Sequence, residues 1–249
     1  MTVVNAYAET IPVVLIDDHP LILEAVARRL ESEPDIRLVA TGRSGEEVGK
    51  LLEQHRPGVM LLDLCIPPRK DTNVRTAGRY PVLGAVRRLA PQYPQTQFII
   101  LSAEVNPAVV DAALASGVRG YLVKDDDLSL QLVEAIKTVY RGDIFLSAEV
   151  ARQVVGRAEE ARRRNTAGLL TERQREILQA VVLDANLSYA EQAQRLGISV
   201  DTFRNHLRAI FQRLGAANLT CAVVRAVQLG LLPPHLLGLR EPPEDKTSP

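Results

Sequence analysis

The stretch VVLIDDHPLILEAVARRL, residues 13–30, joins four consecutive apolar residues to two aspartates and then to a longer segment with apolar residues at helical spacing. A short, uninterrupted apolar run is typical of a strand that is buried on both faces of a sheet. The stretch therefore predicts a strand followed by an amphipathic helix, with Asp17 and Asp18 at the junction between them.

The same strand-then-helix pattern recurs four more times in the first part of the chain. The later apolar runs span 38–40, 59–62, 98–101 and 121–123, and the helical stretches after them span 48–52, 82–89, 109–114 and 128–139. Alternation of this kind is typical of a parallel sheet with helices on both faces. We therefore expect an open, doubly wound α/β domain with a five-stranded parallel sheet over residues 11–146.

The second part of the chain has no strand pattern. Residues 147–168 are rich in arginine and helical in period, which predicts a helical linker. Residues 169–232 then predict a small all-α domain of four helices, at 172–183, 188–196, 200–214 and 219–229. We assign residues 1–10 to an N-terminal extension. The tail 233–249 is rich in proline and charge, and we expect it to be disordered.

Composition narrows the class of protein. No apolar run approaches the roughly 18 residues that cross a bilayer, and the N-terminus lacks the features of a signal peptide, so we expect a cytoplasmic protein without a membrane partner. Cys65 and Cys221 stand far apart in the sequence, which predicts reduced thiols. Residues 1–146 carry 16 basic and 19 acidic residues, against 12 and 8 in 147–232, so only the second part has a basic excess.

Polar residues follow four of the predicted strands. Asp17 and Asp18 end the first apolar run, Asp63 ends the third, Ser102 ends the fourth and Lys124 follows the fifth. The carboxyl ends of parallel strands meet at one edge of the sheet, where polar sites gather. Carboxylate oxygens suit Mg²⁺, and an aspartate near that metal can attack phosphorus. The pattern predicts phosphoryl transfer at this edge.

The segments VVLIDDHPLILEAVARRLE, VMLLDLCIP, FIILSAE and GVRGYLVKDDDL resemble the successive motifs of the receiver domain of two-component response regulators. The resemblance implies that Asp63 is the phosphoacceptor. It implies that Asp17 and Asp18 bind Mg²⁺ together with Asp63 and the backbone carbonyl of Cys65. It also implies that Ser102 is the switch hydroxyl, Tyr121 the aromatic switch and Lys124 the phosphate-binding lysine.

The segment after Asp63 departs from the family pattern. PPRKDTNVRTAGRYP, residues 67–81, is longer than the usual connection by about eight to ten residues, and long connections in compact domains tend to be functional or disordered. Its four basic residues could contact a phosphoryl group, a kinase or nothing; they are Arg69, Lys70, Arg75 and Arg79. A mobile surface loop is the simplest interpretation.

The second part has its own resemblance. LTERQREILQAVV, LSYAEQAQRLGIS, VDTFRNHLRAIFQRLGA and NLTCAVVRAVQLGLL resemble, in order, the four helices of the LuxR-type helix-turn-helix domain. Together with the receiver motifs, they resemble the NarL/FixJ subfamily of response regulators. Gly197 suits the turn between two helices, and Ser199 suits the cap of the next.

The helix at 200–214 has two distinct faces. An apolar stripe predicts the side that packs in the core; it consists of Phe203, Leu207, Ile210, Phe211 and Leu214. The opposite face carries Arg204, Asn205, Arg208 and Gln212, whose types suit base edges and phosphates in a major groove. Arg204, Asn205 and Arg208 are our candidates for DNA contacts, and His206 could reach a phosphate.

The last helix carries apolar residues that we expect to be partly spare after core packing: Leu219, Val223, Ala226, Val227 and Gly230. The resemblance implies that this helix pairs two DNA-binding domains, so that a homodimer matches a two-fold symmetric operator.

The combined hypothesis is a DNA-binding transcription regulator, switched when a sensor histidine kinase phosphorylates Asp63. Such a protein is not an enzyme, although it could catalyse its own phosphorylation and dephosphorylation. One alternative is a phosphorylation-independent regulator of the same fold that responds to a ligand or partner through residues 67–81. A second alternative, an aspartyl phosphatase, is disfavoured because Cys65 stands where that chemistry usually places a second aspartate.

Overall fold

The computed structural model describes residues 10–103, 105–125, 127–163, 168–184 and 187–237. The chain divides into two units, residues 1–147 and 148–249, and each is described by itself. Within the described ranges, no helix has both the length and the apolar character that a membrane span needs. The predicted extension 1–10 lies outside the described residues except for Thr10.

The first unit contains a parallel sheet, as the apolar runs predict. Its strands lie in the order β2-β1-β3-β4-β5-β6, and every neighbouring pair is parallel. Their bounds are β1 Ile11–Ile16, β2 Ile36–Gly42, β3 Val59–Asp63, β4 Gln97–Ser102, β5 Gly120–Val123 and β6 Phe145–Leu146. The five strands predicted from the sequence are confirmed, and the sheet has a sixth that the sequence pattern does not reveal.

The sixth strand corrects the predicted five-stranded sheet. Phe145 and Leu146 pair with Gly120 and Tyr121 of β5 at the edge of the sheet. Two residues are too few to show any periodicity, so this strand depends on the hydrogen bonds that β5 offers and not on a local pattern.

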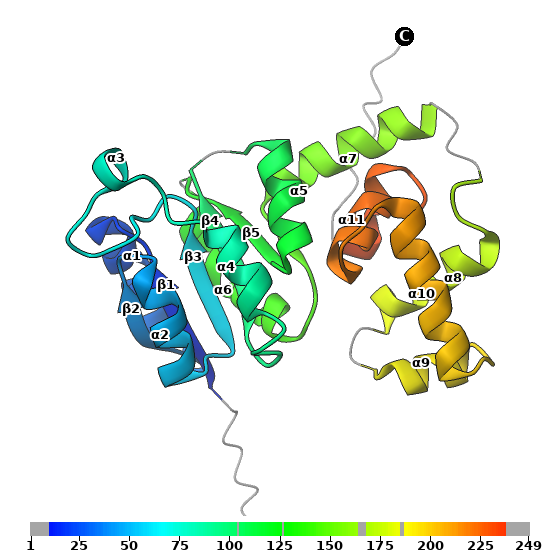
Figure 1. Cartoon of the computed structure of the whole chain (residues 1–249), viewed down its shortest axis with the longest axis horizontal. Helices are drawn as coiled ribbons and strands as arrows, with labels where there is room; N and C mark the ends of the chain where they lie inside the picture. The colour runs from blue at the N-terminus through cyan, green and yellow to red at the C-terminus, as the bar shows by residue number, and fades with distance from the viewer. Residues whose placement is uncertain (1–9, 104, 126, 164–167, 185–186, 238–249) are drawn as a thin grey trace, which may run out of the picture. The chain divides into compact units, whose positions relative to one another are not determined.

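Helices cover both faces of the sheet (Figure 1). α1 (Pro20–Glu31) and α6 (Leu128–Tyr140) pack on one face, against alternate strand residues such as Leu15, Leu61 and Leu101. α2 (Glu46–His55), α4 (Val82–Leu89) and α5 (Pro107–Ser116) lie on the other. Burial on both faces explains why the strands are continuous apolar runs.

The strand order reverses between β1 and β3. The chain leaves β1 towards β2 on one side and leaves β3 towards β4 on the other. In doubly wound sheets such a reversal leaves a crevice at the carboxyl ends of the two strands, where ligands bind. Asp17 and Asp63 stand at those two ends, so the topology itself brings them together.

The long connection 67–81 is docked against α2. The backbone N–H groups of Gly45 and Glu46 donate to the carbonyl oxygens of Pro67 and Pro68 at 2.8 and 2.9 Å. Farther along, the connection forms the short helix α3 (Val74–Ala77), whose first turn is capped by Asn73 (Figure 1). The described contacts therefore replace our simplest interpretation, a loose surface loop, with a segment that is anchored to the domain.

Tyr80 anchors the far end of this connection. Its N–H donates to the carbonyl of Ile66 at 2.9 Å. A Cβ built on Gly45 would lie 2.0 Å from Cγ of the Tyr80 ring, so the ring covers the backbone of Gly45 directly. Glycine is required at position 45 because the ring takes the space of a side chain.

The second unit is helical. Its elements are α7 Ala148–Arg163, α8 Glu172–Leu183, α9 Tyr189–Arg195, α10 Val200–Leu214, α11 Leu219–Gln228 and the 3-10 helix η1 Pro234–Leu237. Side chains cap the starts of the middle helices, with capping boxes at Thr171 and Ser188. Gly197 has φ +67° in the turn before α10, a conformation that glycine adopts at little cost. The four helices predicted over 169–232 are present.

The tail differs from expectation at its start. Residues 234–237 form η1, which contacts α8, and Pro234 is buried. The prediction of disorder is therefore wrong for residues 234–237, because this stretch packs against α8 and buries Pro234. Residues 238–249 lie outside the described residues.

Substitution of Gly45 tests the docking of Tyr80. We expect Gly45→Ala to lower the free energy of unfolding by about 1–3 kcal/mol, because the new methyl group collides with the ring. Removal of the ring in Tyr80→Ala should abolish that cost. Urea unfolding of the two single variants and the double variant measures the coupling.

Gly49 supplies the matched control. It lies within α2, four residues after Gly45, and a Cβ there would meet nothing within 4 Å. Gly49→Ala should leave stability unchanged or raise it by about 0.5–1 kcal/mol. Equal effects of the alanines at positions 45 and 49 would contradict the packing of Tyr80 on Gly45.

Candidate functional site

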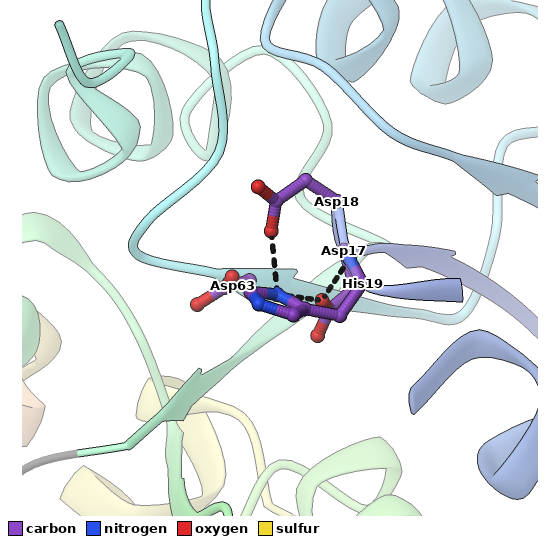
Figure 2. A group of neighbouring side chains, drawn as sticks. All are labelled: Asp17, Asp18, His19 and Asp63. Atoms are coloured by element: carbon purple, nitrogen blue, oxygen red, sulfur yellow. Dashed lines mark hydrogen bonds and ion pairs between the residues drawn. The ribbon is translucent and has the colours of Figure 1, made fainter. Parts of the chain in front are cut away.

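An acidic pocket lies at the carboxyl ends of β1 and β3. Ligand atoms of Asp17, Asp18, His19 and Asp63 all lie within 4.8 Å of one another, and Figure 2 shows the three carboxylates gathered around the imidazole of His19. Asp17 and Asp63 are buried, whereas the side chain of Asp18 is 26% exposed and opens the pocket to solvent. The carboxylates that the sequence predicts to converge do converge.

Lys124 follows β5 and bridges the two buried carboxylates. Its Nζ lies 2.6 Å from Asp17 Oδ2 and 3.0 Å from Asp63 Oδ2. The N–H of Lys124 donates to the carbonyl of Ser102 at 2.7 Å, which fixes the start of the side chain. Because both carboxylates are buried, water does not screen the repulsion between them, and the ammonium of Lys124 reduces this repulsion instead.

Backbone groups hold the carboxylates in place. The N–H of His19 donates to Asp17 Oδ1 at 3.0 Å, and the N–H of Cys65 donates to Asp63 Oδ1 at 3.1 Å. Each buried carboxylate thus has one oxygen bound to backbone and the other directed at Lys124. Both aspartates are oriented by local turns that follow their strands.

His19 is a member of this cluster that our choice of site residues missed. Its Nδ1 lies 2.8 Å from Asp18 Oδ1 and 3.5 Å from Asp17 Oδ1. The imidazole is 67% exposed, so it stands at the mouth of the pocket. Its place directly after two aspartates was the available signal, but one histidine in a polar turn is not specific for any role.

Burial changes the ionisation of Asp17. Desolvation raises the pKa of its carboxyl above the ordinary value, and the hydrogen bond and positive charge of Lys124 only partly oppose that rise. The negative charge of Asp63 acts in the same direction as burial. The ionised form of Asp17 therefore lowers the stability of the fold, and an additional cation in the pocket would offset this loss.

The pocket fits a hard divalent cation. Asp17 Oδ2 and Asp63 Oδ2 are buried, and within the described chain Nζ of Lys124 is the cation that faces them. The donor set consists of carboxylate oxygens, which Mg²⁺ and Ca²⁺ prefer to softer ligands. The acidic pocket is thus able to bind a metal.

The remaining candidates of this half surround the pocket. Ser102 ends β4 and is buried, and Tyr121 lies within β5 with no exposed surface. Cys65 is partly exposed beside Asp63. The residues that the resemblance selects in the receiver half therefore lie at one edge of the sheet, except Tyr121, which lies two residues before the end of β5.

A second polar centre lies beside this pocket, under the connection 67–81. Glu47 is buried and accepts from the N–H of Arg43 at 2.8 Å and from the hydroxyl of Ser44 at 2.9 Å, while Nζ of Lys70 lies 2.8 Å away. These contacts lower the pKa of Glu47 even though burial acts to raise it. Arg43, Glu47 and Lys70 border a cleft of about 370 Å³, together with Asp18 and Asn73. The sequence did not reveal this centre.

The helix α10 presents the two faces that its pattern predicts. Phe203, Leu207, Ile210 and Leu214 are buried, and Phe211 is half-buried. Arg204, Asn205 and Arg208 are exposed, whereas His206 is half-buried. Nη1 of Arg208 donates to Asn205 Oδ1 at 2.8 Å, so these two side chains lie together on the surface.

The expected spare face of α11 is mostly buried. Val223, Ala226 and Val227 are buried, whereas Leu219 and Gly230 are half-buried. The linker helix α7, whose polar composition gave no sign of a docking surface, packs along α11 within the same unit (Figure 1).

Two family models match the chain. The response regulator receiver domain matches residues 13–137, and the domain described as bacterial regulatory proteins of the luxR family matches residues 168–226. The first match covers β2 to β5, most of β1 and the acidic pocket, and the second covers α8, α9, α10 and most of α11.

Curated relatives are similar over both parts. The transcriptional regulatory protein DegU of Brevibacillus brevis is 31% identical over 236 residues, covering 88% of this chain and 94% of its own. The oxygen regulatory protein NreC of Staphylococcus carnosus is 26% identical and covers 81% and 90%.

Solved structures share the fold. The RcsB response regulator of Salmonella typhimurium matches with a TM-score of 0.50 at 19% identity, covering 86% of this chain and 97% of its own. A second RcsB structure, described as two dimers bound to two parallel DNAs, matches with a TM-score of 0.50 at 20% identity.

Replacement of Asp17 tests the cost of its buried charge. In metal-free buffer we expect Asp17→Asn to raise the free energy of unfolding, because the amide needs no desolvated charge. The raised pKa means that the wild-type carboxyl is protonated in the folded chain as pH falls through that pKa, so the advantage of the variant should shrink as pH falls.

Addition of Mg²⁺ should make the wild-type chain more stable than Asp17→Asn, the reverse of the order expected in metal-free buffer. A metal that binds only the folded chain at a hundredfold excess over its Kd stabilises by about 2.7 kcal/mol, and the variant should gain less. Urea unfolding at several pH values, with and without Mg²⁺, measures both effects, with the exposed Glu53→Gln as control. An equal response of Asp17→Asn and wild type to Mg²⁺ would exclude Asp17 as a ligand.

Proposed function

The chain belongs to the two-component response regulators that join a receiver domain to a LuxR-type DNA-binding domain, and we propose that phosphorylation of Asp63 controls its binding to DNA. The observation that carries this proposal is the convergence of Asp17, Asp63 and Lys124, with Lys124 within 3.0 Å of both carboxylates. The phosphoryl donor is a sensor histidine kinase, or a small phosphorylated molecule in its absence.

Asp63 is the proposed nucleophile. Its Oδ1 is held by the N–H of Cys65, and its Oδ2 faces the pocket, where it can form a bond to phosphorus. Lys124 already stands at that oxygen and would hold a phosphoryl oxygen after transfer. In the same proposal Ser102 and Tyr121, on the neighbouring strands β4 and β5, respond to the phosphoryl group as switch residues.

Mg²⁺ is the proposed cofactor, held by Asp17, Asp18, Asp63 and the backbone carbonyl of Cys65. When bound, it would supply positive charge that offsets the repulsion between these carboxylates and an incoming phosphoryl group. The protein supplies the acceptor and the oriented charges, so that it can promote its own phosphorylation and dephosphorylation without turning over a separate substrate.

The exposed face of α10 is the proposed DNA reader. Arg204, Asn205 and Arg208 project from the side opposite the buried stripe, and His206 lies at its margin. Arginine and asparagine can bind guanine and adenine edges in a major groove. The proposed site of action is the cytoplasm, where promoter DNA is accessible.

A homodimer on a two-fold operator is the proposed active form. RcsB, which shares the fold, is described as dimers on DNA. Because α7 covers the apolar side chains of α11, pairing through α11 requires α7 to leave that surface. We propose that phosphorylation favours this release.

Phosphorylation is tested with acetyl phosphate and Mg²⁺. We expect the wild-type chain to form one acid-labile phosphoryl adduct, which Asp63→Asn lacks because an amide is not nucleophilic. Intact-mass spectrometry and phosphate-affinity gels measure the adduct. Absence of the adduct on wild type, or equal labelling of Asp63→Asn, would refute the proposal.

A phosphate mimic separates this proposal from phosphate-independent control. Beryllofluoride should convert the wild-type chain from monomer to dimer and strengthen its binding to a duplex selected from random-sequence DNA. Sedimentation and fluorescence anisotropy measure the two effects. No change in either quantity would favour a regulator that does not use phosphate.

The DNA contacts are tested by alanine substitution. Arg204→Ala or Arg208→Ala should weaken binding by about 1–3 kcal/mol if the lost contact is to a base, while a lost phosphate contact lowers the salt slope by about one. Arg87→Ala, an exposed arginine on α4 of the receiver half, is the control. Unchanged binding in both α10 variants would overturn the assignment.

A further inference from the structure

Near its end, at Arg79 and Tyr80, the connection 67–81 returns to the segment that follows Asp63. The N–H of Tyr80 donates to the carbonyl of Ile66 at 2.9 Å, and the Tyr80 ring covers Gly45. Tyr80 is therefore fixed on both sides, and the residue before it is held next to the segment that follows Asp63. The sequence alone does not show that Arg79 lies near the segment containing Cys65, because the two residues are 14 positions apart.

The charge of Arg79 reaches the edge of the pocket. Burial raises the pKa of the Cys65 thiol, the carboxylate of Asp63 raises it further, and the positive charges of Arg79 and Lys124 oppose the rise. The backbone geometry supports this placement independently: Tyr80, the residue after Arg79, is hydrogen-bonded to Ile66, the residue after Cys65. Cys65 in turn is bound through its N–H to the carboxylate of Asp63.

Arg79 differs from its basic neighbours because its donors are not committed. Arg69 pairs with Asp71 at 3.2 Å, and Lys70 pairs with Glu47 at 2.8 Å. Arg79 is exposed and has neither a hydrogen bond nor an ion pair within the part of the chain that the structure describes. Its five N–H donors are therefore available to an anion at the mouth of the pocket.

The pocket has a need for such a cation. Asp17, Asp18 and Asp63 supply three carboxylates, against the one ammonium of Lys124. A phosphoryl donor brings further negative charge past these groups, and a cation at the entrance lowers that barrier. Guanidinium groups bind phosphoryl oxygens in a two-pronged geometry that strengthens and orients the contact.

We propose that Arg79 is a further phosphate-binding residue of this site, which captures the phosphoryl group of the donor at the mouth of the pocket and directs it to Asp63. The inference rests on the proposed phosphorylation of Asp63. With acetyl phosphate, a bond forms between a carboxylate oxygen of Asp63 and phosphorus, while the bond from phosphorus to the acetate oxygen breaks. Acetate leaves with that electron pair, and Arg79 donates hydrogen bonds without losing a proton.

The test compares the kinetics of phosphorylation by acetyl phosphate in the full chain with saturating Mg²⁺. Arg79→Ala should raise the acetyl phosphate concentration that gives half of the maximal rate by about three- to tenfold, the size of one charge-assisted contact. Arg79→Lys should restore part of the lost affinity for acetyl phosphate, because lysine keeps the positive charge but cannot donate two parallel hydrogen bonds. Added NaCl should slow wild type more than Arg79→Ala, because the contact is ionic.

Arg75→Ala is the matched control. Arg75 is also exposed, also belongs to the connection 67–81 and also has no ion pair among the described residues, but it lies on α3 away from the anchored end. It should leave the kinetics unchanged. Thermal unfolding of each variant checks that the domain remains folded.

The outcomes are distinct. If Arg79→Ala matches wild type while wild type is phosphorylated normally, the role of Arg79 is refuted and the proposed function stands. Equal losses in Arg75→Ala and Arg79→Ala would replace a specific contact with the general charge of the connection, and so would overturn the proposal. Failure of wild type to form any adduct would instead refute phosphorylation of Asp63 itself.

Discussion

Repulsion between carboxylates is the constraint around which the receiver half is built. Asp17 and Asp63 are buried within reach of one ammonium, and Asp18 and His19 lie on the side of the same pocket that is open to solvent. Such a cluster exists only because the reversal of strand order brings the ends of β1 and β3 together and because the rest of the sheet is rigid and apolar. The site is therefore short of positive charge, and both a metal and a cationic side chain at its entrance are ways to supply it.

The sequence predicts this pocket well because each member stands at the end of its own strong strand pattern. Long apolar runs fix the strands, and parallel strands fix which edge their ends share. Ser102 follows from the same reasoning, whereas Tyr121 lies inside β5 and was selected only by the resemblance to the family. The strand β6 is not predictable in this way, since its two residues are ordered by hydrogen bonds to β5 and not by their own periodicity. The same holds for η1, which is ordered by its contact with α8.

The connection 67–81 shows a different limit. Its length and charge are visible in the sequence, yet its docking depends on a tyrosine ring over a glycine 35 positions away and on a buried glutamate that binds Lys70. Neither contact can be recognised from the neighbouring sequence. Gly45 and Glu47 at the start of α2, and Lys70 in the connection, are equally consistent with solvent-exposed turns. The sequence suggests a loose loop, but in the structure this segment is anchored and borders the cleft beside the acidic pocket.

The link between the two units begins at the same strand edge. Tyr121 pairs with Leu146, and its carbonyl accepts from the N–H of Ser147 at 2.9 Å; α7 starts at the next residue. The backbone from which α7 begins is therefore held by β5 through Leu146 and Ser147. Within the second unit, α7 packs against α11. The short β6, which the apolar pattern could not reveal, thus fixes the last residues of the first unit on the edge of the sheet.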